Sequence, residues 1–487
     1  MWKAMTSLKP VRQGWAVRRA RWNSGWMRSW TTCDARCCRW PRVSAMSEAL
    51  AALIGGLNQR LQRAQPRPMH GTLRSIRGVL LRASVAGVRI GELCLLRDPG
   101  NGRELSVEVI GFDEDDAILS PIGSMEGLST RTRIIATGQA MGVQVGDALL
   151  GRVISPMGEF LDGPALTATL GLQRYPLHAE PPAPFSRQRI VEPLSLGVRA
   201  IDSLLTVACG QRMGIFGEPG VGKSSLLASI VRNSDADVIV IGLIGERGRE
   251  VRELLEGQLD EAARARTVAV VATSDRPAAE RVRAAYVATA QAEYHRDQGR
   301  NVLLLMDSLT RFARAQREIG LAVGEPPTRR GYPPSFFSAL PRLLERAGPG
   351  PTGSITALYT VLTEGDAAMD PVAEETRSIL DGHIVLSAEL AQRDHFPAID
   401  VLHSRSRLME QVASAAHRQL ASRMRELIAR RQAIELLIQV GEYAAGSDPL
   451  ADEAIARHAA IEAFLRQPAA EHDTLAQTLA HMRKVLA

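Results

Sequence analysis

Residues 217–225 carry the first pattern with clear chemistry. They fit G-x-x-x-x-G-K-[ST] at every position and directly follow an apolar stretch, residues 212–216. In this pattern the glycines let backbone N–H groups point at phosphate oxygens, and the following helix directs the positive end of its dipole at the same anion. Lys223 is expected to neutralise the β- and γ-phosphates, and the Ser224 hydroxyl to hold Mg²⁺. The predicted nucleotide-binding residues are Gly217, Glu218, Pro219, Gly220, Val221, Gly222, Lys223, Ser224 and Ser225.

Two acidic residues follow other apolar stretches. Asp307 ends the run that begins at Val302, and an acid at the end of such a strand in a P-loop protein is the expected magnesium-side carboxylate. Glu246 follows residues 238–244, where a carboxylate could polarise an attacking water while Arg247 touches the phosphate. Spacing alone leaves a second interpretation open, in which Glu246 merely pairs with arginines at a charged helix start.

The elements that must position these side chains fall into three zones. Short β-type runs punctuated by turn residues extend from 71 to about 137 and predict a small barrel or sandwich. After about 146 the rhythm changes to strand, glycine turn and helix, with near-continuous apolar strands that a parallel sheet buried on both faces requires. From about Leu408 the β-type runs vanish and helical spacing takes over. The predicted fold class is therefore α/β with a β domain before it and a helical domain after it.

The first 45 residues differ in composition from the rest. They contain ten basic residues and one acid, Asp34, together with all six tryptophans. The net charge of +6 for all 487 residues therefore becomes 6 − 9 = −3 for the remaining 442. We interpret residues 1–45 as a disordered or artefactual extension, whose charge says nothing about partners. An ordinary amphipathic helix is expected over residues 46–65, with Ser47 as a possible cap.

The cysteines and the apolar runs exclude further classes. Cys33, Cys37 and Cys38 lack a second ligand pair or a nearby His, so no zinc site is expected. Cys94 and Cys209 stand alone, which fits a reducing cytoplasmic compartment. No apolar run approaches the ~20 residues that span a bilayer.

Longer motifs resemble a known family. Residues 245–250 read Gly-Glu-Arg-Gly-Arg-Glu, and further matches lie at residues 307–322, 324–335, 359–366 and 379–386. The chain resembles the export ATPases of type III secretion systems, in the injectisome branch, which are relatives of the flagellar export ATPase and of the catalytic subunits of F-type ATP synthases. The resemblance runs from about Gly71 to near the C-terminus.

The expected domain order begins with the extension over residues 1–45, which lies outside the resemblance, and an N-terminal helix over 46–70. The resemblance implies that a β-barrel domain over 71–140, a RecA-like ATPase domain over 141–408 and a C-terminal helical domain over 409–487 follow.

The resemblance also implies site roles. It makes Lys223, Glu246, Arg247 and Arg407 catalytic, with Glu246 activating water, Arg247 touching the γ-phosphate and Arg407 acting as the arginine finger of a neighbouring subunit. Arg377 and Arg405 remain rivals for the finger. Mg²⁺ would accompany the substrate ATP on Ser224 and Asp307. Phe396 would stack on adenine, with Tyr443 a weaker candidate for the far side of that pocket.

Partners follow from the same likeness. It implies a homohexamer at the cytoplasmic face of the bacterial inner membrane, with peripheral membrane contact. It also implies stator and central-stalk proteins, and effector–chaperone complexes whose cargo is released and unfolded. The residue 46–65 helix would bind the stator, or would merely cap the barrel.

Three alternatives to an injectisome motor stay in view. One is the flagellar export ATPase. Another is a non-catalytic nucleotide-binding ring subunit, which the presence of Glu246 and Arg407 disfavours. The third is a hexameric RNA translocase, which would need a basic, aromatic-rich face on its barrel. Residues 71–137 hold one aromatic side chain, Phe112, so no nucleic-acid partner is expected.

Overall fold

The computed structural model describes residues 69–163, 171–363 and 370–487. The expected helix over residues 46–65, the extension before it and the first residues after it lie outside this part of the chain. Within it, no helix combines the length and hydrophobicity needed to cross a membrane.

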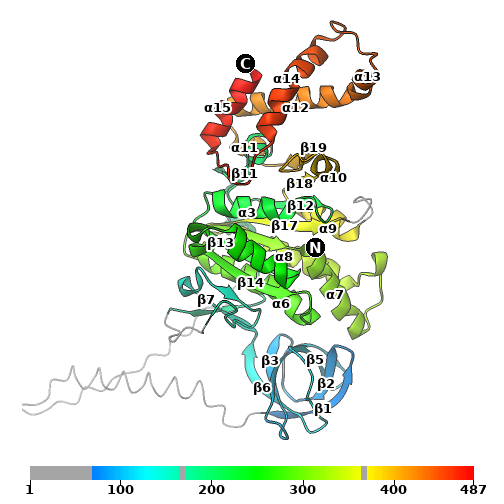
Figure 1. The fold of residues 1–487 in the computed structure, drawn as a ribbon. Helices are drawn as coiled ribbons and strands as arrows, with labels where there is room; N and C mark the ends of the chain where they lie inside the picture. The colour runs from blue at the N-terminus through cyan, green and yellow to red at the C-terminus, as the bar shows by residue number, and fades with distance from the viewer. Residues whose placement is uncertain (1–68, 164–170, 364–369) are drawn as a thin grey trace, which may run out of the picture. The chain divides into compact units, whose positions relative to one another are not determined.

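A closed barrel forms the first part of the described chain (Figure 1). Neighbouring strands are antiparallel, and the first strand pairs with the last. Of the two predicted architectures, the domain is therefore a barrel and not a sandwich. Alternate side chains, such as Leu81, Leu96 and Val107, fill its interior. The barrel order is β1 (His70–Arg77), β2 (Leu80–Ser84), β5 (Asp116–Ile122), β4 (Glu104–Asp113), β3 (Glu92–Arg97), β6 (Arg133–Ala140).

A nine-stranded sheet forms the centre of the nucleotide domain. Most neighbours run parallel, whereas β19 is antiparallel to β18 and β16 to β17. The order is β19 (Ile399–Ser406), β18 (Gly382–Leu386), β12 (Arg212–Gly217), β17 (Ser354–Leu362), β15 (Asn301–Asp307), β13 (Val238–Glu246), β14 (Thr267–Thr273), β8 (Val153–Ile154), with β16 (Gly348–Pro349) beside β17.

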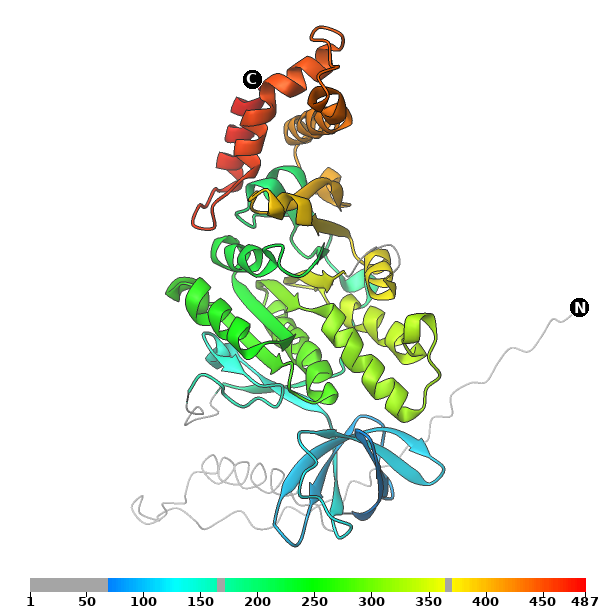
Figure 2. The ribbon, with the colours of Figure 1, turned by 45° about the vertical axis from the view of Figure 1, so that its right-hand side comes forward.

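Both faces of this sheet are covered, as the apolar strands predict (Figures 1 and 2). In β13, Ile239, Ile241 and Leu243 join one core, whereas Val238 and Val240 join the other. Helix α3 (Lys223–Asn233) packs into the first core. Helices α6 (Ala278–Asp297), α7 (Leu309–Val323) and α8 (Pro334–Glu345) pack into the second.

Shorter elements complete this domain. They are β7 (Gly142–Val145) paired with β9 (Gln173–Pro176), β10 (Pro193–Leu194) paired with β11 (Val207–Ala208), η1 (Asp147–Leu149), η2 (Pro184–Ser186), α2 (Arg199–Leu204), α4 (Gly248–Arg252), the π-helix η3 (Glu253–Gln258), α5 (Glu261–Ala265), η4 (Arg329–Gly331), α9 (Pro371–Ile379) and α10 (Ala388–Gln392).

The C-terminal part is helical. Side chains cap the helices: Ser414 accepts a hydrogen bond from the backbone of α12, Asp448 from that of α14 and Thr474 from that of α15. Met424 and Phe464 pack into the same core as α3, so the helices are continuous with one face of the sheet. The helices are α11 (Met409–Val412), α12 (Ala415–Ala433), α13 (Glu435–Gln439), α14 (Pro449–Leu465) and α15 (Leu475–Leu486).

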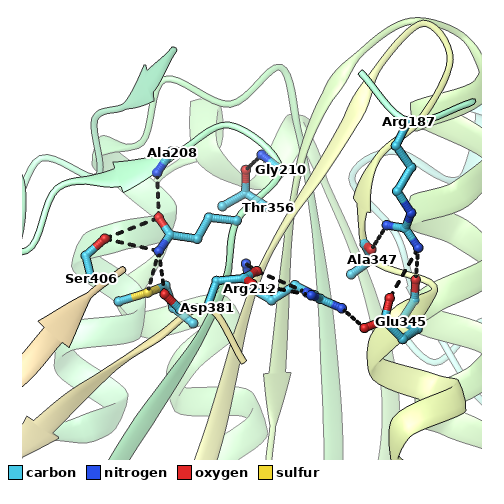
Figure 3. A network of polar contacts seen from close by, with 11 residues as sticks. Arg187, Ala208, Gly210, Arg212, Glu345, Ala347, Thr356, Asp381 and Ser406 are labelled. Atoms are coloured by element: carbon cyan, nitrogen blue, oxygen red, sulfur yellow. Dashed lines mark hydrogen bonds and ion pairs between the residues drawn. The ribbon is translucent and has the colours of Figure 1, made fainter. Parts of the chain in front are cut away.

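A polar network anchors the starting edge of the sheet (Figure 3). Arg212, the first residue of β12, donates a hydrogen bond to Asp381 at 3.1 Å and is also paired with Glu345. Arg187 donates to the Glu345 backbone carbonyl at 2.6 Å. The side-chain amide of Gln211 donates to Ser406 at 3.1 Å. The start of β12 is thereby tied to α8, β18 and β19, and its far end is the P-loop.

A second buried pair holds α6 against the end of α8. Arg346 donates to the Glu293 carboxylate at 2.8 Å and to the Leu177 carbonyl at 2.6 Å. The side chains of Arg346 and Glu293 are 2% and 3% exposed. Breaking such a pair leaves an uncompensated buried charge.

We therefore expect Glu293→Leu to lower the free energy of unfolding by about 3–5 kcal/mol. Glu253→Ala, which breaks an exposed pair with Arg249, should cost at most about 0.5 kcal/mol. Urea unfolding followed by far-ultraviolet circular dichroism measures both, because all six tryptophans lie in residues 1–45 and do not report on this domain. Equal stability of the two variants would contradict the assigned role of the buried pair.

Candidate nucleotide-binding and catalytic site

The P-loop connects the end of β12 to the start of α3. Gly220 and Gly222 adopt φ values of +87° and +85°, a left-handed conformation that favours glycine. Val221 is buried and anchors the loop, whereas residues 218–220 are exposed. Lys223 is the first residue of α3, and Ser224 is exposed beside it. The predicted strand, glycine loop and helix are thus present in that order.

Lys223 forms an ion pair with Asp307. Lys223 follows β12 and Asp307 ends β15, and β17 lies between these two strands. Its Nζ lies 2.6 Å from Asp307 Oδ1, and both side chains are mostly buried. The same carboxylate oxygen accepts a hydrogen bond of 2.6 Å from the Thr360 hydroxyl on β17. Parallel pairing explains the meeting, since β12, β15 and β17 all end at the same edge of the sheet.

Glu246 lies at the same edge as the last residue of β13 and is 7% exposed. Its Oε1 is buried, makes no hydrogen bond, and lies 3.3 Å from Arg311 Nε in an ion pair. Burial, and then the nearby Asp307 carboxylate, raise the pKa of Glu246 to about 7 in spite of Lys223 and Arg311. A carboxylate with this pKa is suited to accept a proton near neutral pH.

Arg311 and Thr360 are contacts that the sequence did not single out. Arg311 lies on the first turn of α7, four residues after Asp307, and its side chain packs over Gly245. A Cβ at Gly245 would lie 2.8 Å from Arg311 Cδ, so only glycine fits there. The position of Arg311 one helical turn after Asp307 is the signal that could have identified it; nothing comparable marks Thr360.

Arg247 directly follows Glu246 but turns outward. Its side chain is 73% exposed and lies 3.5 Å from Glu250. Its contact with the γ-phosphate stays a prediction. The alternative of charge pairing at a helix start applies to Arg247 and Glu250. Glu246 is also paired with an arginine, Arg311, but it is buried near Lys223 and Asp307.

Two of the three candidate finger arginines, Arg405 and Arg407, lie at the starting edge of the sheet. The backbone N–H of Arg407 donates to the Asp381 carbonyl at 2.9 Å, next to the first residue of β12. Arg405 and Arg407 are exposed. Arg377 is half-buried, with its guanidinium 4.6 Å from the ring centroid of Phe216 in its own chain.

The length of β12 separates this edge from the P-loop. The strand has six residues, which span about 17 Å at ~3.3 Å per residue. Arg407 therefore does not lie at the phosphate site of its own chain.

Phe396 contacts the P-loop. A Cβ at Gly222 would lie 2.9 Å from its ring, and the side chain is 40% exposed. Tyr443 lies elsewhere, in the segment before α14, where its hydroxyl donates to Asp452 at 2.9 Å. Adenine stacking by Phe396 and the role of Tyr443 both stay predictions.

The chain also resembles known families by direct comparison. The nucleotide-binding domain of the ATP synthase alpha/beta family matches residues 197–406, and the beta-barrel domain of that family matches residues 74–138. The T3SS EscN ATPase C-terminal domain matches residues 413–484. Fold and site together define a nucleotide-binding P-loop ATPase of the alpha/beta family.

Individual relatives narrow this class. The Type 3 secretion system ATPase of Sinorhizobium fredii (strain NBRC 101917 / NGR234) is 52% identical over 436 residues, covering 90% of this chain and 96% of the relative. The Flagellum-specific ATP synthase of Bacillus subtilis (strain 168) is 46% identical over 412 residues, covering 84% and 94%.

Solved structures agree. The assembled ATPase EscN from enteropathogenic E. coli superposes with a TM-score of 0.81 at 48% identity, covering 86% of this chain and 100% of that one. EscN in complex with its central stalk EscO gives 0.79 at 47% identity, with the same coverage. The chain belongs to the type III secretion system ATPase family, related to the flagellar ATPase and the F-type ATP synthases; it hydrolyses ATP and drives export.

The raised pKa of Glu246 has a consequence for stability. Between the ordinary glutamate value and about 7, the folded protein binds this proton more tightly than the unfolded chain, so stability falls as pH rises through that window. Glu246→Gln removes the cost of ionising the buried group. We expect the variant to have a higher Tm than the wild type at pH 8, and the difference to shrink toward pH 5.

Thermal unfolding of the nucleotide-free protein in EDTA measures this difference. Glu256→Gln, at a position exposed to solvent, is the matched control and should leave Tm unchanged at both pH values. If the Glu246→Gln variant is no more stable than the wild type at pH 8, burial does not make ionisation of Glu246 costly and its pKa is not raised.

Proposed function

We propose that the chain hydrolyses Mg-ATP as a homohexamer, with each active site completed by a neighbouring copy. The observation that carries the proposal is the division of the site between two edges of one sheet. Lys223, Glu246 and Asp307 meet at one edge, whereas Arg407 is exposed at the other. An arginine finger placed there serves a different copy of the chain.

Each residue then has a defined task. The P-loop N–H groups and Lys223 hold the phosphates, and Glu246 orients and deprotonates the water that attacks the γ-phosphate in line. Arg407 of the neighbour stabilises the charge that develops on the equatorial oxygens, a contribution worth ~10³–10⁵ in rate. The burial of Glu246 near Lys223 and Asp307 and its raised pKa support this assignment, because a base with a pKa of about 7 can take the proton near neutral pH.

The donor set fits Mg²⁺ carried by the nucleotide. A hydroxyl from Ser224 and a carboxylate from Asp307 are the hard oxygen ligands that Mg²⁺ prefers, and the ion keeps its other positions for phosphate and water. When bound, Mg²⁺ neutralises charge on the β- and γ-phosphates.

Mixing two inactive variants tests the shared site. Glu246→Gln and Arg407→Ala should each lower kcat at least a hundredfold, about 2.7 kcal/mol or more. In a hexamer mixed 1:1, about a quarter of the interfaces combine an intact Glu246 with an intact Arg407, so activity should return toward a quarter of the wild type.

Parallel mixtures with Arg405→Ala and Arg377→Ala identify which arginine is the finger. Glu253→Ala, an exposed charge change on the π-helix after α4, is the active control. If no mixture regains activity, catalysis is confined to one chain and the proposal fails. If even the wild type binds ATP without turnover, the non-catalytic ring subunit is favoured instead.

The cellular setting of the motor is proposed by analogy. The turnover cycle would release effector–chaperone complexes and unfold the effectors at the cytoplasmic face of the inner membrane. A stator protein would hold the ring there through the helix expected at residues 46–65, and a central stalk would bind the ring. The solved complex of EscN with its central stalk EscO supports a stalk as partner.

Deleting residues 46–65 tests the stator contact. The deletion should abolish binding of the stator protein and leave the far-ultraviolet circular dichroism of the remainder unchanged. Copurification from the native bacterium, beside the full chain, measures this. Undiminished stator binding would assign the helix to the barrel alone.

A further inference from the structure

The loop that carries Phe396 is held by the C-terminal helices. His395, the residue before Phe396, is 3% exposed, and its Nδ1 lies 3.0 Å from Glu462 Oε2 on α14. An ionised carboxylate can only accept a hydrogen bond, so Nδ1 carries the proton. The backbone N–H of Gln467, just after α14, donates to the Phe396 carbonyl at 2.9 Å. Phe396 and the residue before it are thus both held, one by α14 and the other by the segment directly after it.

Gln467 also binds a segment that packs against the C-terminal end of α3, the helix that follows the P-loop. Its side chain, in a residue 6% exposed, donates to the Gly197 carbonyl at 2.9 Å and accepts from the Arg199 N–H at 2.8 Å. Gly197 packs against Asn233, the last residue of α3, where a Cβ would come within 2.3 Å. Phe396 packs against Gly222 at the start of α3. The end of α14 therefore contacts segments that touch both ends of the P-loop helix.

The charges around Glu462 favour the ionised carboxylate, which accepts the hydrogen bond from His395. The hydrogen bond from His395 lowers the pKa of Glu462, and the neighbouring His458 and Arg466 add to the effect. The carboxylate is consequently ionised near neutral pH and remains an acceptor for His395.

We propose that Glu462 is a positioning residue for nucleotide binding: through His395 it holds Phe396 against the P-loop, so that the C-terminal helices set the affinity for the base of the nucleotide. The inference rests on the proposed adenine contact of Phe396. A movement of α14 relative to the sheet then changes nucleotide affinity without any change at Lys223, Glu246 or Asp307.

Four variants of the full chain test this assignment. Glu462→Ala should raise KM for ATP and Kd for a fluorescent ADP about fivefold or more, with kcat within about twofold of the wild type, because base stacking is worth ~1–3 kcal/mol. Glu462→Gln keeps an oxygen that accepts from His395 and should restore most of the affinity. Glu453→Ala removes another carboxylate of α14, paired with Arg423 and Arg457, and should change neither constant. Phe396→Ala is the reference for loss of the ring itself.

Inorganic tripolyphosphate, which lacks a base, separates positioning from general damage. Its inhibition constant should be the same for the wild type, Glu462→Ala and Phe396→Ala. If Glu462→Ala weakens tripolyphosphate and ADP equally, or if Gln fails to rescue, the residue is merely structural and the inference is wrong. If Phe396→Ala weakens ADP but Glu462→Ala does not, the inference alone is overturned. If Phe396→Ala has no effect on ADP, the proposed adenine contact itself fails.

Discussion

The buried ion pair between Lys223 and Asp307 is the interaction on which the site depends. An ammonium group in this largely buried position needs a carboxylate beside it, and the parallel register of β12, β17 and β15 brings that carboxylate to 2.6 Å. Burying a second acid at the same edge raises the pKa of Glu246 to about 7, which makes it a competent base. The sheet itself therefore holds in place the groups that we propose bind phosphate and activate water, as electrostatic preorganisation requires.

The same sheet also explains why the site is divided. A parallel strand has its two ends at opposite edges, so residues that follow β12 and residues that precede it are separated by the length of the strand, about 17 Å here. The network around Arg212 and Asp381 fixes the starting edge, and Arg407 is bonded to it through the Asp381 carbonyl. Its guanidinium is thus available to another molecule and remote from the phosphates of its own chain. This separation is the reason for our proposal that copies of the chain share each active site.

The local sequence pattern was enough to predict those site residues that directly follow a recognisable strand or glycine loop. Lys223 and Ser224 follow from the glycine loop, and Asp307 and Glu246 from their places at strand ends, which the structure confirms as neighbours. The barrel closes because β1 pairs with β6, and the paired residues are more than 60 positions apart in the sequence. The local strand pattern does not indicate such a pairing, so it was equally compatible with a sandwich. Thr360 and Glu462 carry no local signature, because each acts through a partner that only tertiary packing supplies. The hydroxyl of Tyr443 donates to Asp452, and its predicted place at the adenine pocket stays a prediction.

We propose that catalysis takes place at an interface shared by copies of the chain. The most direct measurement is the steady-state rate of Mg-ATP hydrolysis per mole of protein, recorded over a wide range of protein concentrations together with the mass of the species in solution. We expect specific activity to rise with concentration in parallel with the fraction of assembled protein. A monomer that turns over ATP at the full rate at high dilution would contradict it.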